Sequence, residues 1–205
     1  MIRAYVVVAG VTLVAAAASA EPQRGATTTA PIRAVKIMPA KRSLTPPPAI
    51  SKTIYLERCS GGCTITSDGN TQNAQTLQSP IPNPGQYNVA EFQNAAHQSG
   101  TAADAEWAML LQCMKEVYSP FNVVVTDVKP TGGLTYHLAL IAGTPGDINL
   151  GNDILGIAPL ASDCSAQDNA ISFSFANAHP QTDPVDRTFN ICCRCCHGPR
   201  CQHEH

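Results

Sequence analysis

Charge is scarce in this sequence. Lysine, arginine, aspartate and glutamate together make up 14% of it, and its formal net charge is −2. No basic patch is present, so we expect no nucleic-acid partner. The sequence shows no internal repeat, no glycine-rich phosphate loop and no serine–histidine–aspartate arrangement. Beyond the N-terminus, no run of residues is apolar enough to span a membrane.

The N-terminal residues predict a secretion signal. Residues 1–20 combine Arg3, an apolar run over 6–18 and the small-residue cleavage pattern Ala18-Ser19-Ala20. An N-terminal membrane anchor is the alternative, but the apolar run is short for a membrane span. We therefore expect a mature chain that begins at Glu21, is secreted or periplasmic, and has no membrane association after signal cleavage.

The next segment predicts a linker. Residues 21–52 are rich in proline and threonine and contain Pro46-Pro47-Pro48. Such a composition cannot bury a core, so we expect a disordered or extended linker, with a short pro-segment as the alternative. Order should begin at Thr53.

Residues 53–190 predict one domain of the α/β class, more closely α+β. Residues 104–118 carry an apolar stripe at helical spacing, and Ser119-Pro120 ends that helix. Patterns rich in β-branched or alternating apolar residues predict five strands, over 53–58, 121–128, 136–142, 155–160 and 170–176. We expect a twisted mixed sheet of about five strands backed by one long helix.

Two segments of this region are expected to be irregular. Residues 71–100 are polar and contain three prolines, which indicates a long surface loop. A second helix should follow Ala176 to cover the other face of the sheet. The final residues, ICCRCCHGPRCQHEH, have no apolar stripe. We therefore expect no helix there, an incomplete fold, and an apolar sheet face left exposed.

Several short motifs follow one another between Thr53 and Asn177. They are Ile54-Tyr55-Leu56 with Arg58-Cys59-x-Gly61-Gly62-Cys63-Thr64, Cys113-x-Lys115-Glu116-Val117-Tyr118-x-Pro120-Phe121, Val125-Thr126-Asp127-Val128, Gly156-Ile157-Ala158-Pro159 before Cys164, and Asn169-Ala170-Ile171-Ser172-Phe173-x-Phe175-Ala176-Asn177. In order and spacing they resemble the N-terminal subdomain of metzincin-type zinc metalloproteases. The likeness is closest to exported metzincin-like proteins of the myxobacterial type.

The resemblance implies a chemistry for which this chain lacks the central motif. In the intact family, a helix with HExxHxxGxxH binds zinc and activates a water molecule for peptide hydrolysis. This sequence contains no HExxH, and His203-Glu204-His205 has its histidines only two residues apart. We therefore expect a metallopeptidase-like protein that is inactive as written, with zinc and a peptide or protein substrate expected only for the complete family domain. There, the substrate would lie along an edge strand that contains Leu155, Gly156, Ile157 and Ala158.

Two explanations fit the missing motif. In the first, a frameshift or early stop makes the residues after about Phe189 or Asn190 out-of-frame sequence. In the second, residues 191–205 are a genuine cysteine- and histidine-rich tail, and the protein is an exported non-enzymatic binding or structural module. Whether the chain is an enzyme is left open by its sequence.

Nine cysteines in an exported chain are expected to form disulfides, bind metal, or both. The CxxC spacings of the tail suggest a zinc or copper site, with oxidised or disordered thiols as the competing interpretation. Its candidate ligands are Cys192, Cys193, Cys195, Cys196, Cys201 and His203. For disulfides the candidates are Cys59, Cys63, Cys113 and Cys164. Cys59 and Cys63 pair with each other or with other cysteines, and Cys164 pairs with Cys113 or with the Cys192–Cys193 region.

Overall fold

The protein is described by a computed structural model over residues 34–38, 51–161 and 167–196. The predicted signal at 1–20 and most of the predicted linker fall outside these residues, as do Cys164, Cys201 and His203. Within the described part of the chain, no helix is long and apolar enough to cross a membrane.

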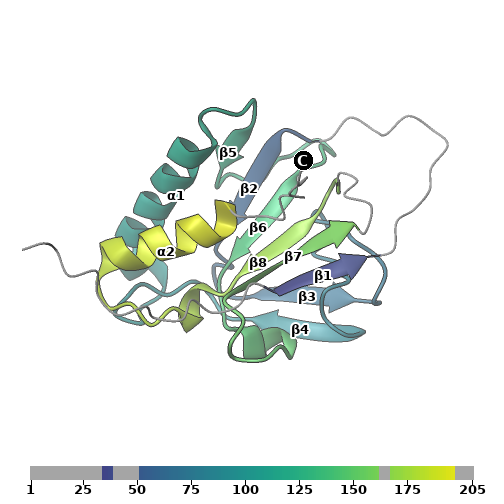
Figure 1. Cartoon of the computed structure of the whole chain (residues 1–205), viewed down its shortest axis with the longest axis horizontal. Helices are drawn as coiled ribbons and strands as arrows, with labels where there is room; N and C mark the ends of the chain where they lie inside the picture. The colour runs from purple at the N-terminus through teal and green to yellow at the C-terminus, as the bar shows by residue number, and fades with distance from the viewer. Residues whose placement is uncertain (1–33, 39–50, 162–166, 197–205) are drawn as a thin grey trace, which may run out of the picture. The chain divides into compact units, whose positions relative to one another are not determined.

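A six-stranded sheet forms the centre of the fold, in the order β1-β7-β8-β6-β2-β5 (Figure 1). Strands β2, β5, β6 and β8 are parallel to one another, whereas β7 is antiparallel to β8 and β1 is parallel to β7. The predicted α/β class with a mixed sheet is confirmed, and all five predicted strands are present. The bounds are β1 Ala34–Met38, β2 Thr53–Glu57, β5 Val124–Thr126, β6 His137–Ile141, β7 Gly156–Ala161 and β8 Ile171–Ser174.

Each face of the sheet is covered by a different layer. Helices α1 (Asp104–Tyr118) and α2 (Pro184–Cys196) lie on one face, and they pack against each other. On the other face, the antiparallel pair β3 (Cys63–Ser67) and β4 (Gly85–Val89) contributes to the second core. Alternation along β2 sends Leu56 into the helix-side core and Tyr55 into the other. The expected uncovered face is therefore absent.

Short 3-10 turns join these elements. They are η1 (Gly100–Ala103), η2 (Pro145–Ile148) and η3 (Ala176–Ala178). η1 leads directly into α1. η2 follows β6 and η3 follows β8, so both lie at the carboxyl ends of parallel strands.

Helix α2 corrects the expectation that the end of the sequence forms no helix. The Asp183 carboxylate accepts hydrogen bonds from the backbone N–H groups of Val185 and Asp186, both at 2.9 Å, so Asp183 caps the helix. Pro184 occupies the first turn, where its fixed φ suits a helix and its missing N–H costs nothing. The buried stripe of α2 consists of Arg187, Thr188, Ile191 and Cys192.

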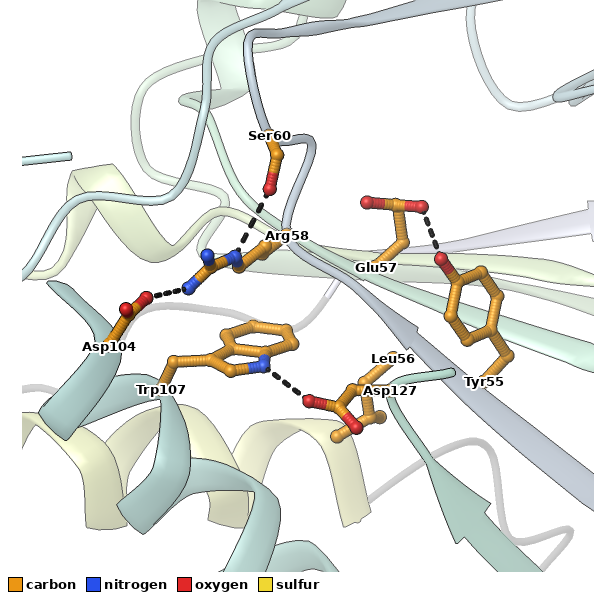
Figure 2. A pocket seen from close by; sticks show the side chains of 8 residues that line it. All are labelled: Tyr55, Leu56, Glu57, Arg58, Ser60, Asp104, Trp107 and Asp127. Atoms are coloured by element: carbon orange, nitrogen blue, oxygen red, sulfur yellow. Dashed lines mark hydrogen bonds and ion pairs between the residues drawn. The ribbon is translucent and has the colours of Figure 1, made fainter. Parts of the chain in front are cut away.

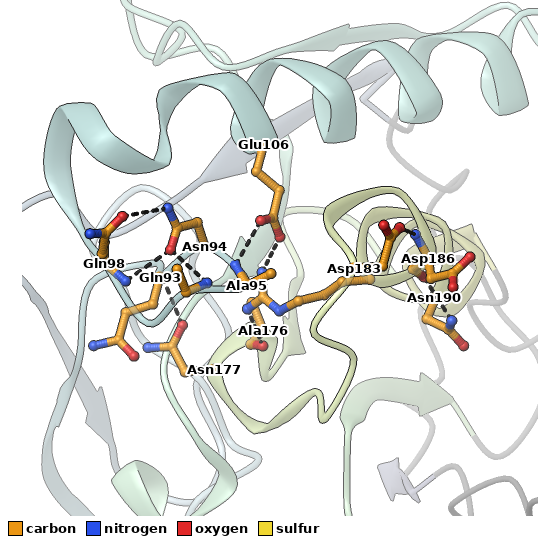
Figure 3. A network of polar contacts seen from close by, with 12 residues as sticks. Gln93, Asn94, Ala95, Gln98, Glu106, Ala176, Asn177, Asp183, Asp186 and Asn190 are labelled. Carbon is orange, nitrogen blue, oxygen red and sulfur yellow. Dashed lines mark hydrogen bonds and ion pairs between the residues drawn. The ribbon is translucent and has the colours of Figure 1, made fainter.

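Two links attach α2 to α1. A disulfide joins Cys113 of α1 to Cys192 of α2. An ion pair joins the Arg187 guanidinium to the Glu106 carboxylate, and both side chains are at least 96% buried. Figure 3 shows the surrounding network, in which the Ala95 N–H donates to Glu106 at 2.7 Å. Arg187 also donates to the Ala176 carbonyl at 2.6 Å. These links make Ile191 and Cys192 part of the folded core rather than of a separate tail.

Strand β1 corrects two further expectations. It lies within the segment 21–52, predicted to be a disordered or extended linker, so regular structure begins before Thr53. It pairs along the length of β7, from Ala34 opposite Ile157 to Met38 opposite Ala161. The predicted edge position of Leu155, Gly156, Ile157 and Ala158 is therefore wrong, because β7 lies between β1 and β8.

The segment 71–100 is more ordered than its polar composition predicts. It contains β4, and its Gln78 forms isolated bridges with Thr66 and Asn73. Ala74, Ile81 and Phe92 are buried, with at most 4% of their surface exposed. A few apolar side chains spaced far apart anchor this segment, a pattern that no helix or strand periodicity reveals.

Candidate functional site

A polar pocket of about 380 Å³ lies where β2 and β5 end. In sheets with parallel strands, the carboxyl ends are the usual place for a binding site, because the loops that follow diverge there. Glu57 ends β2 and Arg58 follows it, while Asp127 directly follows β5. The pocket is lined by Tyr55, Leu56, Glu57, Arg58, Ser60, Asp104, Trp107 and Asp127 (Figure 2).

Hydrogen bonds fix most of the polar side chains of this pocket. The Arg58 guanidinium donates to Asp104 at 2.6 Å and to Ser60 Oγ at 3.1 Å, and it lies 6.0 Å from the ring centroid of Trp107. The Trp107 indole N–H donates to Asp127 at 3.1 Å. These contacts, drawn in Figure 2, hold the indole between a cation and a carboxylate.

On the other side of the pocket, Glu57 is held by two donors. The Tyr55 hydroxyl donates to one carboxylate oxygen at 2.6 Å, and the Cys59 backbone N–H donates to the other at 2.8 Å. The pKa of Tyr55 is raised, first by burial and then by the hydrogen bond and negative charge of Glu57, with a smaller contribution from Asp127. Burial and the Glu57 charge also raise the pKa of Tyr136. The pocket therefore disfavours further negative charge.

Negative groups outnumber positive ones in the pocket. Glu57, Asp104 and Asp127 supply three carboxylates, and Arg58 supplies one guanidinium. Because Arg58 is paired with Asp104, its charge is largely compensated. Neither Glu57 nor Asp127 takes part in an ion pair within the described residues. The uncompensated charge of the pocket is thus negative and lies beside Trp107 and Tyr55.

Beside the pocket, Glu57 also faces a disulfide. Cys59 and Cys63 are bonded to each other, which confirms one of the two predicted pairings. A carboxylate oxygen of Glu57 and the two sulfurs lie within 4.8 Å of one another, so these three residues could hold a metal ion. Thiolates are the metal ligands, so such a site would require reduction of the disulfide.

The other predicted site residues have different positions. Cys192 is not available as a metal ligand, because it forms the disulfide with Cys113; the predicted pairing of Cys113 with Cys164 is wrong for the same reason. Cys193 and Cys195 lie on α2, and their predicted metal role stays a prediction. Cys196 ends α2, and its side chain is outside the described residues, as are Cys164, Cys201 and His203.

Within the part of the chain that the structure describes, the residues do not fit the zinc site implied by the metzincin resemblance. The helix that follows the last strand is α2, which carries no histidine. Its inward side chains form a disulfide and an ion pair with α1 instead of converging as metal ligands.

The pocket residues were not singled out from the sequence. Arg58 and Asp127 occur in separate motifs of the metzincin resemblance, and Glu57 lies in the predicted strand 53–58, but no local pattern groups the three as a site. The sequence feature that could have indicated the pocket is their position, because all three lie at the carboxyl ends of strands β2 and β5, which are parallel neighbours. That neighbour relation joins residues about 70 positions apart and is not visible in a local pattern.

The fold and the pocket define a disulfide-linked mixed α/β domain with an acidic site at the ends of two parallel strands. No protein-family model matches the chain, and no curated protein or solved structure matches it either.

Proposed function

We propose that this chain is an exported binding module without peptidase activity, and that its acidic pocket binds a small cationic group such as a primary ammonium. The observation that carries the proposal is the pocket at the ends of β2 and β5, where Glu57 and Asp127 face the same cavity as Trp107. Carboxylates beside an aromatic ring suit an ammonium group, because Coulomb attraction and cation–π contact act together.

This proposal keeps the resemblance of the scaffold to metzincin-like proteins, but it assigns no peptide hydrolysis to the chain. The sequence has no HExxH, and α2 uses its inward face to bind α1. Export is supported by the two disulfides, since such bonds persist in oxidising compartments. The acidic pocket offers charge and shape for recognition, with three carboxylates beside one tryptophan.

Trp107 makes the proposal directly testable, because it is the only tryptophan in the sequence and lies in the pocket. We expect its fluorescence to change saturably when n-butylammonium is added to the full chain, and not when butyrate is added. Glu57→Gln and Asp127→Asn should each weaken the affinity by about tenfold, which corresponds to about 1.4 kcal/mol for a lost charge contact.

Glu116→Gln is the matched control, because Glu116 is an exposed carboxylate on α1 that does not line the pocket. An equal response to butylammonium and butyrate would contradict the proposal, as would unchanged affinity in both pocket variants. A peptidase assay with and without chelator tests the remaining part: cleavage that the chelator abolishes would show that the chain is a metallopeptidase.

A further inference from the structure

The two cysteines of the Cys59–Cys63 disulfide differ in their exposure to solvent. Cys59 is 1% exposed, whereas Cys63 is only half-buried. The three residues between them, Ser60, Gly61 and Gly62, are exposed. A thiol from solvent can therefore reach this turn and approach Cys63, while Cys59 stays covered.

The backbone of this turn is unusual. Cys59 has a φ of 55°, a left-handed conformation that is uncommon for residues other than glycine. Gly61 and Gly62 continue it with φ values of 74° and 94°, which glycine adopts readily. Such backbone is often associated with functional sites. The turn is closed by the Gly62 N–H, which donates to the Cys59 carbonyl at 2.6 Å.

The Glu57 carboxylate is the third component. One of its oxygens lies within 4.8 Å of both sulfurs, close enough for transfer directly or through one water molecule. Its orientation is fixed by the Tyr55 hydroxyl and by the Cys59 N–H, at 2.6 and 2.8 Å. An ionisable carboxyl group beside a shielded cysteine can exchange a proton with it as the sulfur changes between disulfide and thiol.

We propose that Cys59 and Cys63 form a redox-active disulfide that accepts electrons from dithiols, with Glu57 as the proton-transfer group. This goes beyond the binding role, because it depends on the sulfurs and not on the cationic ligand. The Cys113–Cys192 disulfide provides an internal contrast: it joins two packed helices, Cys192 is 0% exposed, and its role is structural.

The first step of the exchange is attack on the accessible sulfur. Glu57 accepts the proton of one thiol of the dithiol, and the resulting thiolate attacks Cys63 Sγ. The bond between Cys59 and Cys63 breaks, its electron pair stays on Cys59 Sγ, and Glu57 returns the proton to that sulfur. The product is a mixed disulfide between the dithiol and Cys63.

The second step releases the oxidised product. The remaining thiol of the dithiol loses its proton to water and attacks the dithiol's own sulfur in the mixed disulfide. The bond to Cys63 Sγ breaks, and Cys63 leaves as a thiolate that takes a proton from water. Overall, the dithiol loses two electrons and two protons, and the Cys59–Cys63 pair gains them.

The main test uses the unmodified full chain under native conditions. The protein is exposed to dithiothreitol for increasing times, quenched with acid, alkylated and mapped by peptide mass spectrometry. We expect Cys59 and Cys63 to be reduced at least tenfold faster than Cys113 and Cys192. Reduction of both pairs at the same rate would overturn the proposal, as would slower reduction of Cys59–Cys63.

Faster reduction alone would also describe an exposed structural disulfide, so Glu57 needs its own test. Glu57→Gln should slow reduction at least fivefold at neutral pH, and Glu57→Asp should restore part of the rate. Glu91→Gln is the control, because Glu91 accepts a hydrogen bond from Gly61 N–H in the same turn but is not part of the sulfur group. Equal rates in Glu57→Gln and the unmodified chain would overturn the role of Glu57.

Single cysteine variants test which sulfur is attacked. In Cys59→Ser the remaining thiol is the accessible Cys63, and in Cys63→Ser it is the shielded Cys59. We expect Cys63 to react with an aromatic disulfide reagent at least tenfold faster than Cys59, as followed at the peptide level. The reverse order would overturn the assignment. Because neither variant changes a residue that lines the pocket, Trp107 fluorescence with butylammonium tests the binding role independently.

Discussion

Arg187 shows how one charged residue can be part of a core. Its guanidinium binds the Glu106 carboxylate, donates to the Ala176 carbonyl and lies 5.4 Å from the ring centroid of Phe92. A charge in this position is tolerated only because all of these partners are present. Sequence alone predicts no helix around Arg187, and it does not reveal that Arg187 and Glu106 meet.

Removing one member of this pair should be costly. We expect Arg187→Ala to lower the free energy of unfolding by about 3–5 kcal/mol, because it leaves Glu106 charged and buried without its counterion. Asp104→Asn is the control, since the Arg58–Asp104 pair is partly exposed and should contribute no more than about 1 kcal/mol. Urea denaturation followed by circular dichroism gives both values; equal losses in the two variants would contradict this account.

At the scale of the element, α1 is predictable and α2 is not. Residues 104–118 carry an apolar stripe, and Trp107, Leu110 and Met114 are buried as the pattern predicts. The other two stripe residues differ: Leu111 is partly buried, and Val117, near the end of the helix, is 41% exposed. Periodicity is a strong signal when the buried side chains are themselves apolar.

The buried side chains of helix α2 also lie on one face, but most of them are not strongly apolar. Its buried positions 187, 188, 191 and 192 fall on one face, but they hold arginine, threonine, isoleucine and cysteine. Only Ile191 is strongly apolar, so the stripe is invisible to a hydrophobicity pattern, although a shielded cysteine packs like a small apolar residue. The helix start was visible: Asp183-Pro184 combines an N-cap residue with proline in the first turn. Because a hydrophobicity pattern misses α2, it predicts an unfinished fold, whereas α2 packs on the sheet beside α1.

The disulfide between α1 and α2 should contribute more stability than the one in the turn. Cys113 and Cys192 are 79 residues apart in sequence, whereas Cys59 and Cys63 are four apart. Loop entropy predicts about 4–5 kcal/mol for the long loop and about 2 kcal/mol for the short one. We expect Cys113→Ser/Cys192→Ser to lower the denaturation midpoint more than Cys59→Ser/Cys63→Ser. The opposite ranking in guanidinium denaturation would show that strain or residual structure outweighs loop entropy.

For the whole molecule, the sequence predicts the class of fold, but it does not predict how the sheet is completed and covered. The five strands and the long helix have local signals, so the mixed α/β class is predictable. Strand β1 has only five residues in a segment rich in proline and threonine, and it depends on pairing with β7. The acidic pocket and the covered sheet faces likewise depend on neighbours far apart in sequence, which local propensity does not determine.

Stability of the whole domain should decrease in mildly acidic solution. Burial lowers the pKa of His137 below its ordinary value of 6.5, and Asp168 opposes this only in part. Below pH 6.5 the unfolded chain therefore binds a proton at this histidine that the folded chain resists, so the free energy of unfolding falls as the pH drops from 7 to 5. His137→Gln should reduce this dependence, as measured by urea denaturation at each pH. Asp68 contributes little to the change between pH 7 and pH 5, because hydrogen bonds from Thr71 and Asn70 lower its pKa to about 2.

The pairing of β1 with β7 also sets an order of events during synthesis. Ala34 lies opposite Ile157, so the first strand leaves the ribosome more than 100 residues before its partner does. Until then its backbone hydrogen-bonding groups must be satisfied by water or by some other molecule. Likewise, the Cys113 thiol has no disulfide partner until Cys192 has been synthesised. The domain therefore cannot close until β7 and α2 have emerged, and a growing chain has an unpaired β1 over more than 100 residues of synthesis and an unpaired Cys113 thiol over 79.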